Sequence, residues 1–143
     1  MIKIKNISAQ ETYNIRLTVL RNNIDLPYKF LEDKDMDTFH LGAFYKEKLV
    51  GIATFIKNNI NDIEGSQYQL RGMATLPEVR GKGYGSKLIE KAKEILQQKG
   101  ITILWCNARK EAAKFYEGLG FQVIGEEFEV KKVGPHYKMY AQI

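Results

Sequence analysis

The segment from Tyr68 to Lys99 constrains the fold more than any other part of the chain. It predicts a strand that ends near Thr75, a turn, a glycine-rich run at residues 80–85 (RGKGYG), and an amphipathic helix that ends at Gly100. Residues 101–106 (ITILWC) follow as an almost unbroken apolar run, which is typical of a strand covered on both faces. Strand, helix and strand at this spacing predict a right-handed βαβ unit with a parallel strand pair.

The glycine-rich run has the composition of a phosphate-binding loop. Gly81, Gly83 and Gly85 can adopt positive φ angles and leave no Cβ in the path of a ligand. The start of the following helix adds N–H groups without partners and the positive end of the helix dipole. The spacing is not that of a Walker loop, and Ser86 stands where the dinucleotide fingerprint GxGxxG has its third glycine.

The rest of the chain predicts one mixed α/β domain over residues 1–143, with a central mixed sheet of about seven strands and helices on both faces. Strands outside the βαβ unit are expected at residues 1–5, 39–45, 49–56, 121–128 and 137–142. Ser8 and Glu11 form a capping box for a first helix. Its apolar face is expected to hold Tyr13, Leu17, Leu20 and Ile24. Asn107 can cap the last helix, as an alternative to a contact with a ligand. Residues 25–38 are expected to form a loop, with or without a short helical piece.

Composition limits which binding partners and which cellular compartment we expect. The net charge is +5, but the lysines are dispersed and no RRM, KH or zinc-finger pattern occurs, so we expect no nucleic-acid partner. No apolar run approaches the ~20 residues of a membrane span, so we expect no membrane insertion. The one cysteine, Cys106, excludes an intrachain disulfide and fits a reducing cytoplasm. We expect no metal site.

Four segments together resemble the GNAT superfamily of N-acetyltransferases. Residues 80–85 resemble its [RQ]-x-x-G-x-[GA] loop, and residues 73–78 its central strand and the turn that leaves it. Residues 107–109 resemble the end of its next strand, and residues 112–121 (AAKFYEGLGF) its A-x-x-F-Y-x-x-x-G-F segment. The element order of the whole chain matches too, so the sequence is identified as a member of this family.

The resemblance implies that acetyl-CoA binds the glycine-rich loop and the strand before it. The N–H groups of residues 81–86 would hold the pyrophosphate, and the pantetheine arm would pair with the strand. Gly72 suggests a bulge that opens a gap for the thioester and frees an N–H near Met73 or Ala74 to stabilise an oxyanion. The implied cofactor-binding residues are Met73, Ala74, Thr75, Arg80, Gly81, Lys82, Gly83, Tyr84, Gly85, Ser86, Asn107 and Tyr116.

The resemblance also implies a general acid but gives no base. Tyr116 matches the phenol that protonates the leaving thiolate of CoA, and core packing beside Phe115 is its alternative role. A lysine-like amine has a pKa of ~10.4, so its deprotonation at pH 7 costs about 4.6 kcal/mol and requires a base or a less basic acceptor. Many relatives carry a carboxylate in the central strand, where this chain has Gln67, Gln69 and Arg71. The substitutes near the C-terminus are Glu127, Glu129 and His136.

We therefore predict a cytoplasmic N-acetyltransferase that moves an acetyl group from acetyl-CoA directly to a primary amine. The acceptor is a small molecule or a peptide that the sequence does not identify, and a homodimer is compatible with the sequence. Two alternatives stay open. One is a non-catalytic module that senses acyl-CoA, which the presence of Tyr116 disfavours. The other is a nucleic-acid-associated factor, suggested only by the basic charge.

Overall fold

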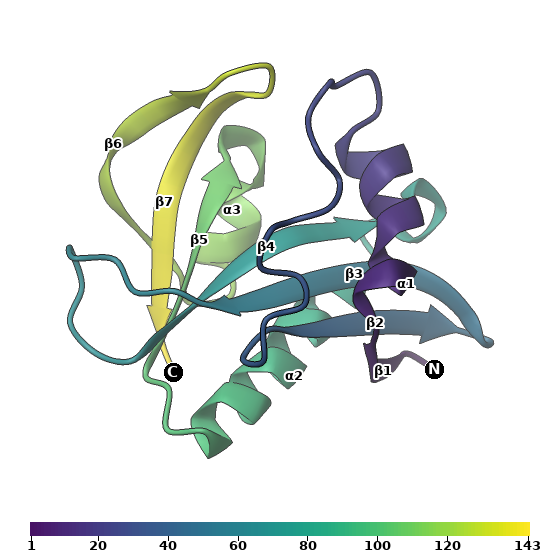
Figure 1. Cartoon of the computed structure of the whole chain (residues 1–143), viewed down its shortest axis with the longest axis horizontal. Coiled ribbons are helices and arrows are strands. Elements are labelled where there is room, and N and C mark those ends of the chain that lie inside the picture. The colour runs from purple at the N-terminus through teal and green to yellow at the C-terminus, as the bar shows by residue number, and fades with distance from the viewer.

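Seven strands form one sheet in the computed structural model, which describes residues 1–143 (Figure 1). The strands are β1 (Lys3–Ile7), β2 (Phe39–Tyr45), β3 (Lys48–Lys57), β4 (Gln67–Thr75), β5 (Ile103–Arg109), β6 (Gln122–Val130) and β7 (Gly134–Gln142). Their order in the sheet is β1-β2-β3-β4-β5-β7-β6. Neighbouring strands are antiparallel except β4 and β5, which are parallel as the βαβ pattern predicts.

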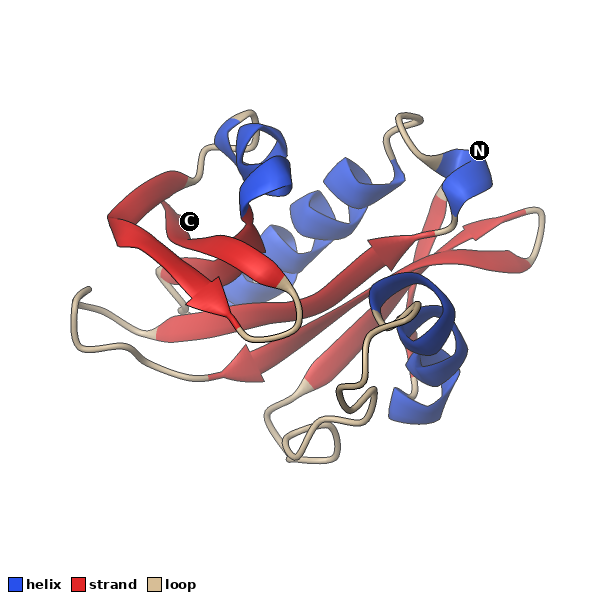
Figure 2. Ribbon diagram, turned by 90° about the horizontal axis from the view of Figure 1, so that it is seen from above, coloured by secondary structure: helices blue, strands red, loops and turns tan.

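Helices cover both faces of this sheet (Figure 2). One face carries α1 (Ala9–Ile15) and the π-helical turn η1 (Arg16–Leu20). The other carries α2 (Tyr84–Gln98) and α3 (Ala113–Glu117). Two short 3-10 turns, η2 (Pro77–Val79) and η3 (Lys110–Ala112), precede α2 and α3. The expected mixed sheet with helices on both faces is confirmed. No helix is long and apolar enough to cross a membrane.

The main core lies between the sheet and α2. Leu88, Ile89, Ala92 and Leu96 of α2 are fully buried, as the apolar stripe of the sequence predicts. Gly100 follows the helix with a φ of 77°, the left-handed conformation that ends many helices. The apolar run in β5 is buried on both faces, since Ile103, Leu104, Trp105 and Cys106 are all at most 3% exposed. This packing fixes the position of the loop between β4 and α2.

The parallel pair β4–β5 separates halfway along its length. Pairing extends only from Gln67–Leu70 of β4 to Ile103–Cys106 of β5. Beyond Leu70 the register with β3 shifts, because two residues of β4, Gly72 and Met73, oppose the single residue Ala53 of β3. Gly72 has a φ of 62°. The bulge that Gly72 suggests is therefore present. It leaves the β5-facing edge of residues 72–75 without a strand partner.

Two local predictions are wrong. The buried face of the first helical segment holds Ala9, Thr12, Ile15 and Arg16, whereas Leu17 is 46% exposed. The buried face is already set in α1 by Ala9, Thr12 and Ile15, which leaves Leu17 on the exposed side. A π turn follows, in which the N–H of Arg21 bonds the carbonyl of Arg16, five residues back. Asn107 does not cap a helix, because β5 continues to pair with β7 as far as Arg109.

A buried polar cluster joins η1 to the sheet. Arg16 is fully buried and forms a bidentate ion pair with Asp33, with N–O distances of 2.7 and 2.8 Å. Arg16 Nη2 also donates to Thr54 Oγ1, which in turn contacts His40 Nδ1 at 2.8 Å. His40 Nε2 donates to the carbonyl of Asp33. These bonds order the segment 25–38 that the sequence leaves as a loop.

Candidate active site

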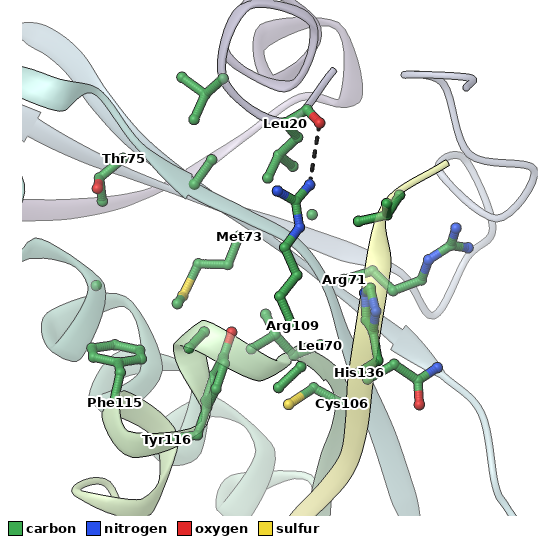
Figure 3. A pocket seen from close by; sticks show the side chains of 18 of the residues that line it. Leu20, Leu70, Arg71, Met73, Thr75, Cys106, Arg109, Phe115, Tyr116 and His136 are labelled. Carbon is green, nitrogen blue, oxygen red and sulfur yellow. Dashed lines mark hydrogen bonds between the residues drawn. The ribbon is translucent and has the colours of Figure 1, made fainter. Parts of the chain in front are cut away.

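A cavity of about 870 Å³ occupies the gap where β4 and β5 separate (Figure 3). Its walls come from η1, the second half of β4, the glycine-rich loop, the end of β5, α3 and β7. Residues far apart in the sequence thus meet in one space. Most of the implied site residues line it: Met73, Ala74, Thr75, Arg80, Gly81, Gly83, Tyr84, Gly85, Ser86, Asn107, Tyr116 and His136. Lys82, Glu127 and Glu129 do not.

The glycine-rich loop presents free N–H groups to one end of this cavity. No hydrogen bond within the protein engages the N–H groups of Gly81, Gly83, Tyr84, Gly85 and Ser86. The N–H of Lys82, by contrast, bonds the carbonyl of Val79 at 3.3 Å. Gly81 and Gly83 have φ angles of 75° and 90°, and a Cβ at either position would meet no atom within 4 Å. This open cradle at a helix start suits a phosphate group.

Gly85 differs from Gly81 and Gly83 because it lies in a closely packed contact. A Cβ on Gly85 would lie 3.1 Å from Cζ of Phe115 and 3.8 Å from the Met73 side chain. The missing side chain therefore lets α2 approach α3 and β4 closely. The contact also fixes the glycine-rich loop at the Phe115 end of the cavity, the same side as Thr75 and Met73 (Figure 3).

Tyr116 projects from α3 with its hydroxyl directed into the cavity (Figure 3). Its ring packs edge-on between Phe115 and Phe121, with centroid distances of 5.1 and 5.3 Å. The side chain is buried, and this burial, with a smaller contribution from Cys106, raises the pKa of the phenol. Tyr116 is thus a neutral proton donor at any physiological pH, held rigidly at the cavity wall.

Cys106 lies beside it in β5 and has the properties of a buried thiol. Burial raises the pKa of Cys106 to about 12, so the thiolate that a nucleophile needs does not form. Asn107, the next residue, is exposed and lines the cavity, and its side-chain amide makes no hydrogen bond within the protein. Its amide is therefore free to contact a ligand.

His136 is the one candidate base that reaches the cavity. It lies in β7, opposite Arg109 of β5, and is 7% exposed. Its Nδ1 lies 2.9 Å from the carbonyl of Gly134. A carbonyl only accepts hydrogen bonds, so Nδ1 carries the proton and Nε2 of the neutral ring is left as an acceptor. Nε2 has no partner within the protein, which leaves it able to take a proton from a ligand.

The structure places Glu127 and Glu129 on β6, outside the cavity. Glu127 is ion-paired with Lys110 at 2.9 Å and accepts a hydrogen bond from the hydroxyl of Tyr137. The hydrogen bond from Lys110, aided by that from Tyr137, lowers the pKa of Glu127, which weakens it as a base. Glu129 lies opposite Pro135 near the β6–β7 turn. Neither carboxylate lines the cavity, although Val130 at the end of the same strand does.

The three central-strand side chains have separate roles. Gln67 is buried and bonds the backbone of Ile60, which anchors the loop after β3. Gln69 accepts a hydrogen bond from Asn58 at 3.0 Å. Arg71 instead lines the cavity, stacks on the ring of Phe30 at 4.1 Å and pairs with Glu32 at 3.2 Å. Gln67 is therefore structural, whereas Gln69 and Arg71 both line the cavity.

The cavity lining includes two further arginines, which the sequence analysis did not assign to the site. Arg21 follows η1 and Arg109 ends β5. Arg109 donates to the carbonyl of Leu20 at 3.2 Å, a contact between residues 89 positions apart (Figure 3). The only signal in the sequence was the position of Arg109 at the end of a strand beside the candidate site.

Comparison with known proteins identifies the family. Residues 4–121 match the sequence profile described as the Acetyltransferase (GNAT) family. The chain belongs to the GNAT family. It is therefore an acyltransferase of the acetyl-transferring type, and the alternative of a non-catalytic module is not supported.

Individual GNAT proteins match over nearly the whole chain. The uncharacterized N-acetyltransferase YitI of Bacillus subtilis is 39% identical over 142 residues, which cover 98% of this chain and 95% of YitI. Escherichia coli ElaA superposes with a TM-score of 0.82 at 20% identity and 99% coverage of both chains. The PaiA N-acetyltransferase of Thermoplasma acidophilum, solved in complex with coenzyme A, has a TM-score of 0.71 at 19% identity and covers 100% of this chain and 99% of its own. The last two likenesses show a shared fold.

Proposed function

We propose that this GNAT protein transfers an acetyl group from acetyl-CoA to a primary amine, with the cofactor lying along β4 and its pyrophosphate in the glycine-rich loop. The free N–H groups of Gly81, Gly83, Tyr84, Gly85 and Ser86 carry the proposal, because they converge on one open cradle. Arg80 adds a positive charge to the same end. The PaiA protein, a structural neighbour, was solved with coenzyme A, which supports the same ligand here.

The open edge of β4 supports the position of the pantetheine arm. Residues 72–75 have no strand partner on the side that faces β5, so their backbone groups are available to an extended ligand. Met73, Ala74 and Thr75 line the cavity along this edge, and Asn107 of β5 lines it too. When bound, acetyl-CoA supplies an activated thioester, and the bulge at Gly72 would leave a backbone N–H near Met73 or Ala74 to stabilise the oxyanion.

Proton transfers fall to two side chains of the cavity. Tyr116 donates a proton to the leaving thiolate, for which its raised pKa and rigid packing are suited. His136 accepts a proton from the amine at Nε2, either directly or through a water molecule. Glu127 and Glu129 are not needed in this scheme. We place the reaction in the cytoplasm, where reducing conditions suit the free thiol of Cys106.

Calorimetry with acetyl-CoA tests the proposal. In Gly83→Asp, a carboxylate would occupy the cradle, so we expect acetyl-CoA affinity to fall by at least two orders of magnitude. Gly100→Asp is the matched control, because Gly100 also has a positive φ and open space at Cβ but lies outside the cavity. Wild-type affinity in Gly83→Asp would remove the loop assignment.

Turnover in the same protein tests the chemistry. Release of free CoA thiol with a panel of primary amines should be measurable, and it should depend on the amine. In His136→Gln, we expect the acid limb of the kcat/KM profile to flatten, because the group that loses its base function on protonation has been removed. Binding of acetyl-CoA without turnover of any amine would leave a cofactor-binding protein of another function.

A further inference from the structure

The end of the cavity away from the glycine-rich loop, here called the inner end, is lined by arginines and by no acidic side chain. Arg21, Arg71 and Arg109 all contribute to the lining, in which neither Asp nor Glu occurs. Glu32 pairs with Arg71 at 3.2 Å but from outside the lining. In Figure 3, Arg71 lies beside His136, on the opposite side of the cavity from Thr75 and Phe115, with Arg109 between the two sides. This end is thus distinct from the glycine-rich loop.

One carbonyl oxygen holds two of these guanidinium groups together. The oxygen of Leu20 accepts a hydrogen bond from Nη2 of Arg109 at 3.2 Å and one from Nη1 of Arg21 at 3.4 Å. Arg21 is fixed further by a bond from Nε to the carbonyl of Pro27 at 2.9 Å. Neither Arg21 nor Arg109 takes part in an ion pair. A neutral carbonyl positions the two charges but does not compensate them.

Repulsion among these arginines affects the pKa of Arg21. Burial lowers the pKa of Arg21, and the positive charges of Arg109, Arg71 and Arg16 lower it further. Like charges held together without a counter-ion are costly at low dielectric, and a bound anion removes that cost. Guanidinium groups that retain unused N–H donors bind carboxylate and phosphate oxygens in well-defined geometry.

We infer that the acceptor is a small primary amine that also carries an anionic group, a carboxylate or a phosphate, which binds Arg21 and Arg109 with Arg71 beside them. This inference rests on the proposed acetyl transfer. The pyrophosphate of the cofactor does not account for these arginines, because Gly85 fixes the glycine-rich loop against Phe115 at the other end. Amino acids and phosphorylated amino alcohols fit this description. Polyamines and lysine-rich peptides do not, since their extra cations would meet no acidic side chain in the lining and several positive ones.

The same charges favour the reactive form of the amine. A positive environment disfavours the ammonium ion and so lowers the pKa of an amine bound near it. The cavity contains no carboxylate that would stabilise the ammonium instead. The arginines would therefore bind the anionic end of the acceptor and ease the deprotonation of its amino group, which His136 completes.

Competing acceptors test the inference in the intact protein. Initial rates of CoA thiol release would be compared for glycine, glutamate and O-phosphoethanolamine against glycinamide, ethanolamine and spermidine. We expect kcat/KM to be at least tenfold higher for an anionic amine than for its uncharged counterpart. The glycine–glycinamide comparison tests the carboxylate, and the O-phosphoethanolamine–ethanolamine comparison tests the phosphate. Spermidine or glycinamide as the better acceptor would overturn the inference while leaving acetyl transfer intact.

A binding measurement separates this inference from the proposed function. Calorimetry of glutamate and O-phosphoethanolamine on protein saturated with CoA requires no transfer. Arg109→Gln should weaken binding of the preferred anion by roughly 10- to 100-fold, the worth of a charged hydrogen bond. Lys34→Gln, which removes a positive charge from an exposed site outside the cavity, should leave it unchanged. Arg109-dependent binding without turnover would support the anion site and count against the transferase. Absence of both binding and turnover for the anionic amines, or equal binding in Arg109→Gln, would overturn the inference.

Discussion

At the scale of the residue, the hydroxyl of Tyr116 is the group on which turnover should depend most. Tyr116→Phe removes the proton donor but keeps the ring that packs against Phe115 and Phe121. We expect kcat to fall by roughly 10²–10⁴, the usual contribution of a positioned acid, because the leaving thiolate must then be protonated by water. Acetyl-CoA affinity, measured by calorimetry, should change little.

The control for this substitution is Tyr45→Phe, which removes a phenol oxygen from an exposed position at the end of β2. It should leave kcat and the melting temperature as they are in the wild type. Equal kcat for Tyr116→Phe and the wild type would assign Tyr116 to core packing. A large loss of acetyl-CoA affinity or of melting temperature in Tyr116→Phe would also contradict the acid role.

At the scale of the element, the bulge in β4 decides whether the cavity exists. The Cβ of an alanine at position 72 would lie 2.9 Å from Cε2 of Phe30. Phe30 cannot easily move, because its ring is held between the guanidinium groups of Arg16 at 3.9 Å and Arg71 at 4.1 Å. Gly72→Ala should therefore lower the free energy of unfolding by about 2–4 kcal/mol, from left-handed strain and overpacking together. Urea denaturation measures the loss.

Gly100→Ala separates the two contributions. Gly100 has a φ of 77°, but a Cβ there would meet nothing within 4 Å, so only the strain of about 1 kcal/mol is expected. If Gly72→Ala costs no more than Gly100→Ala, the contact with Phe30 is not tight. Because the bulge also sets the edge of β4, kcat/KM should fall in Gly72→Ala and not in Gly100→Ala.

At the scale of the whole molecule, the buried cluster of Arg16, Asp33, Thr54 and His40 should make stability depend on pH. Burial lowers the pKa of His40, so folded His40 stays neutral at a pH where an unfolded histidine, with a pKa of ~6.5, takes up a proton. The unfolded state then binds more protons, and the free energy of unfolding falls as the pH drops below about 6.5. Urea midpoints measured between pH 7.5 and 5 should show this decline.

Asp33 extends the decline to lower pH. Burial alone would raise the pKa of Asp33, but hydrogen bonds from Arg16 and from the N–H of Phe30 outweigh it, and the pKa is lowered. Its contribution to stability is thus lost only under more acid conditions, as the carboxylate is protonated. His40→Gln removes the titrating imidazole and should flatten the slope between pH 6.5 and 5. Thr54→Val removes hydrogen bonds but keeps the imidazole, so it should lower stability and retain the slope. Equal slopes in His40→Gln and the wild type would rule out His40 as the source.

Elements with local sequence signals could be predicted before the structure was known. The capping box of Ser8 and Glu11 forms as predicted, with both reciprocal hydrogen bonds present. The parallel pair β4–β5, the bulge at Gly72 and the apolar stripe of α2 were likewise readable, because backbone conformation and hydrophobic period are properties of neighbouring residues. The glycine-rich loop and Tyr116 could be identified because each belongs to a short family motif of neighbouring residues.

The contacts between side chains on different elements depend on tertiary packing and could not be predicted from local patterns. Arg16 bonds Asp33, 17 positions away, and Thr54, 38 positions away, and no local pattern predicts a fully buried arginine in the first helical segment. The π turn that begins at Arg16 is likewise not predicted by a hydrophobic period of 3.6 residues per turn. The convergence of Arg21 and Arg109 on Leu20 depends in the same way on contacts across the cavity. Such contacts are set by how the elements pack, so the sequence predicts the glycine-rich loop, whereas the grouping of the cavity arginines depends on the folded chain.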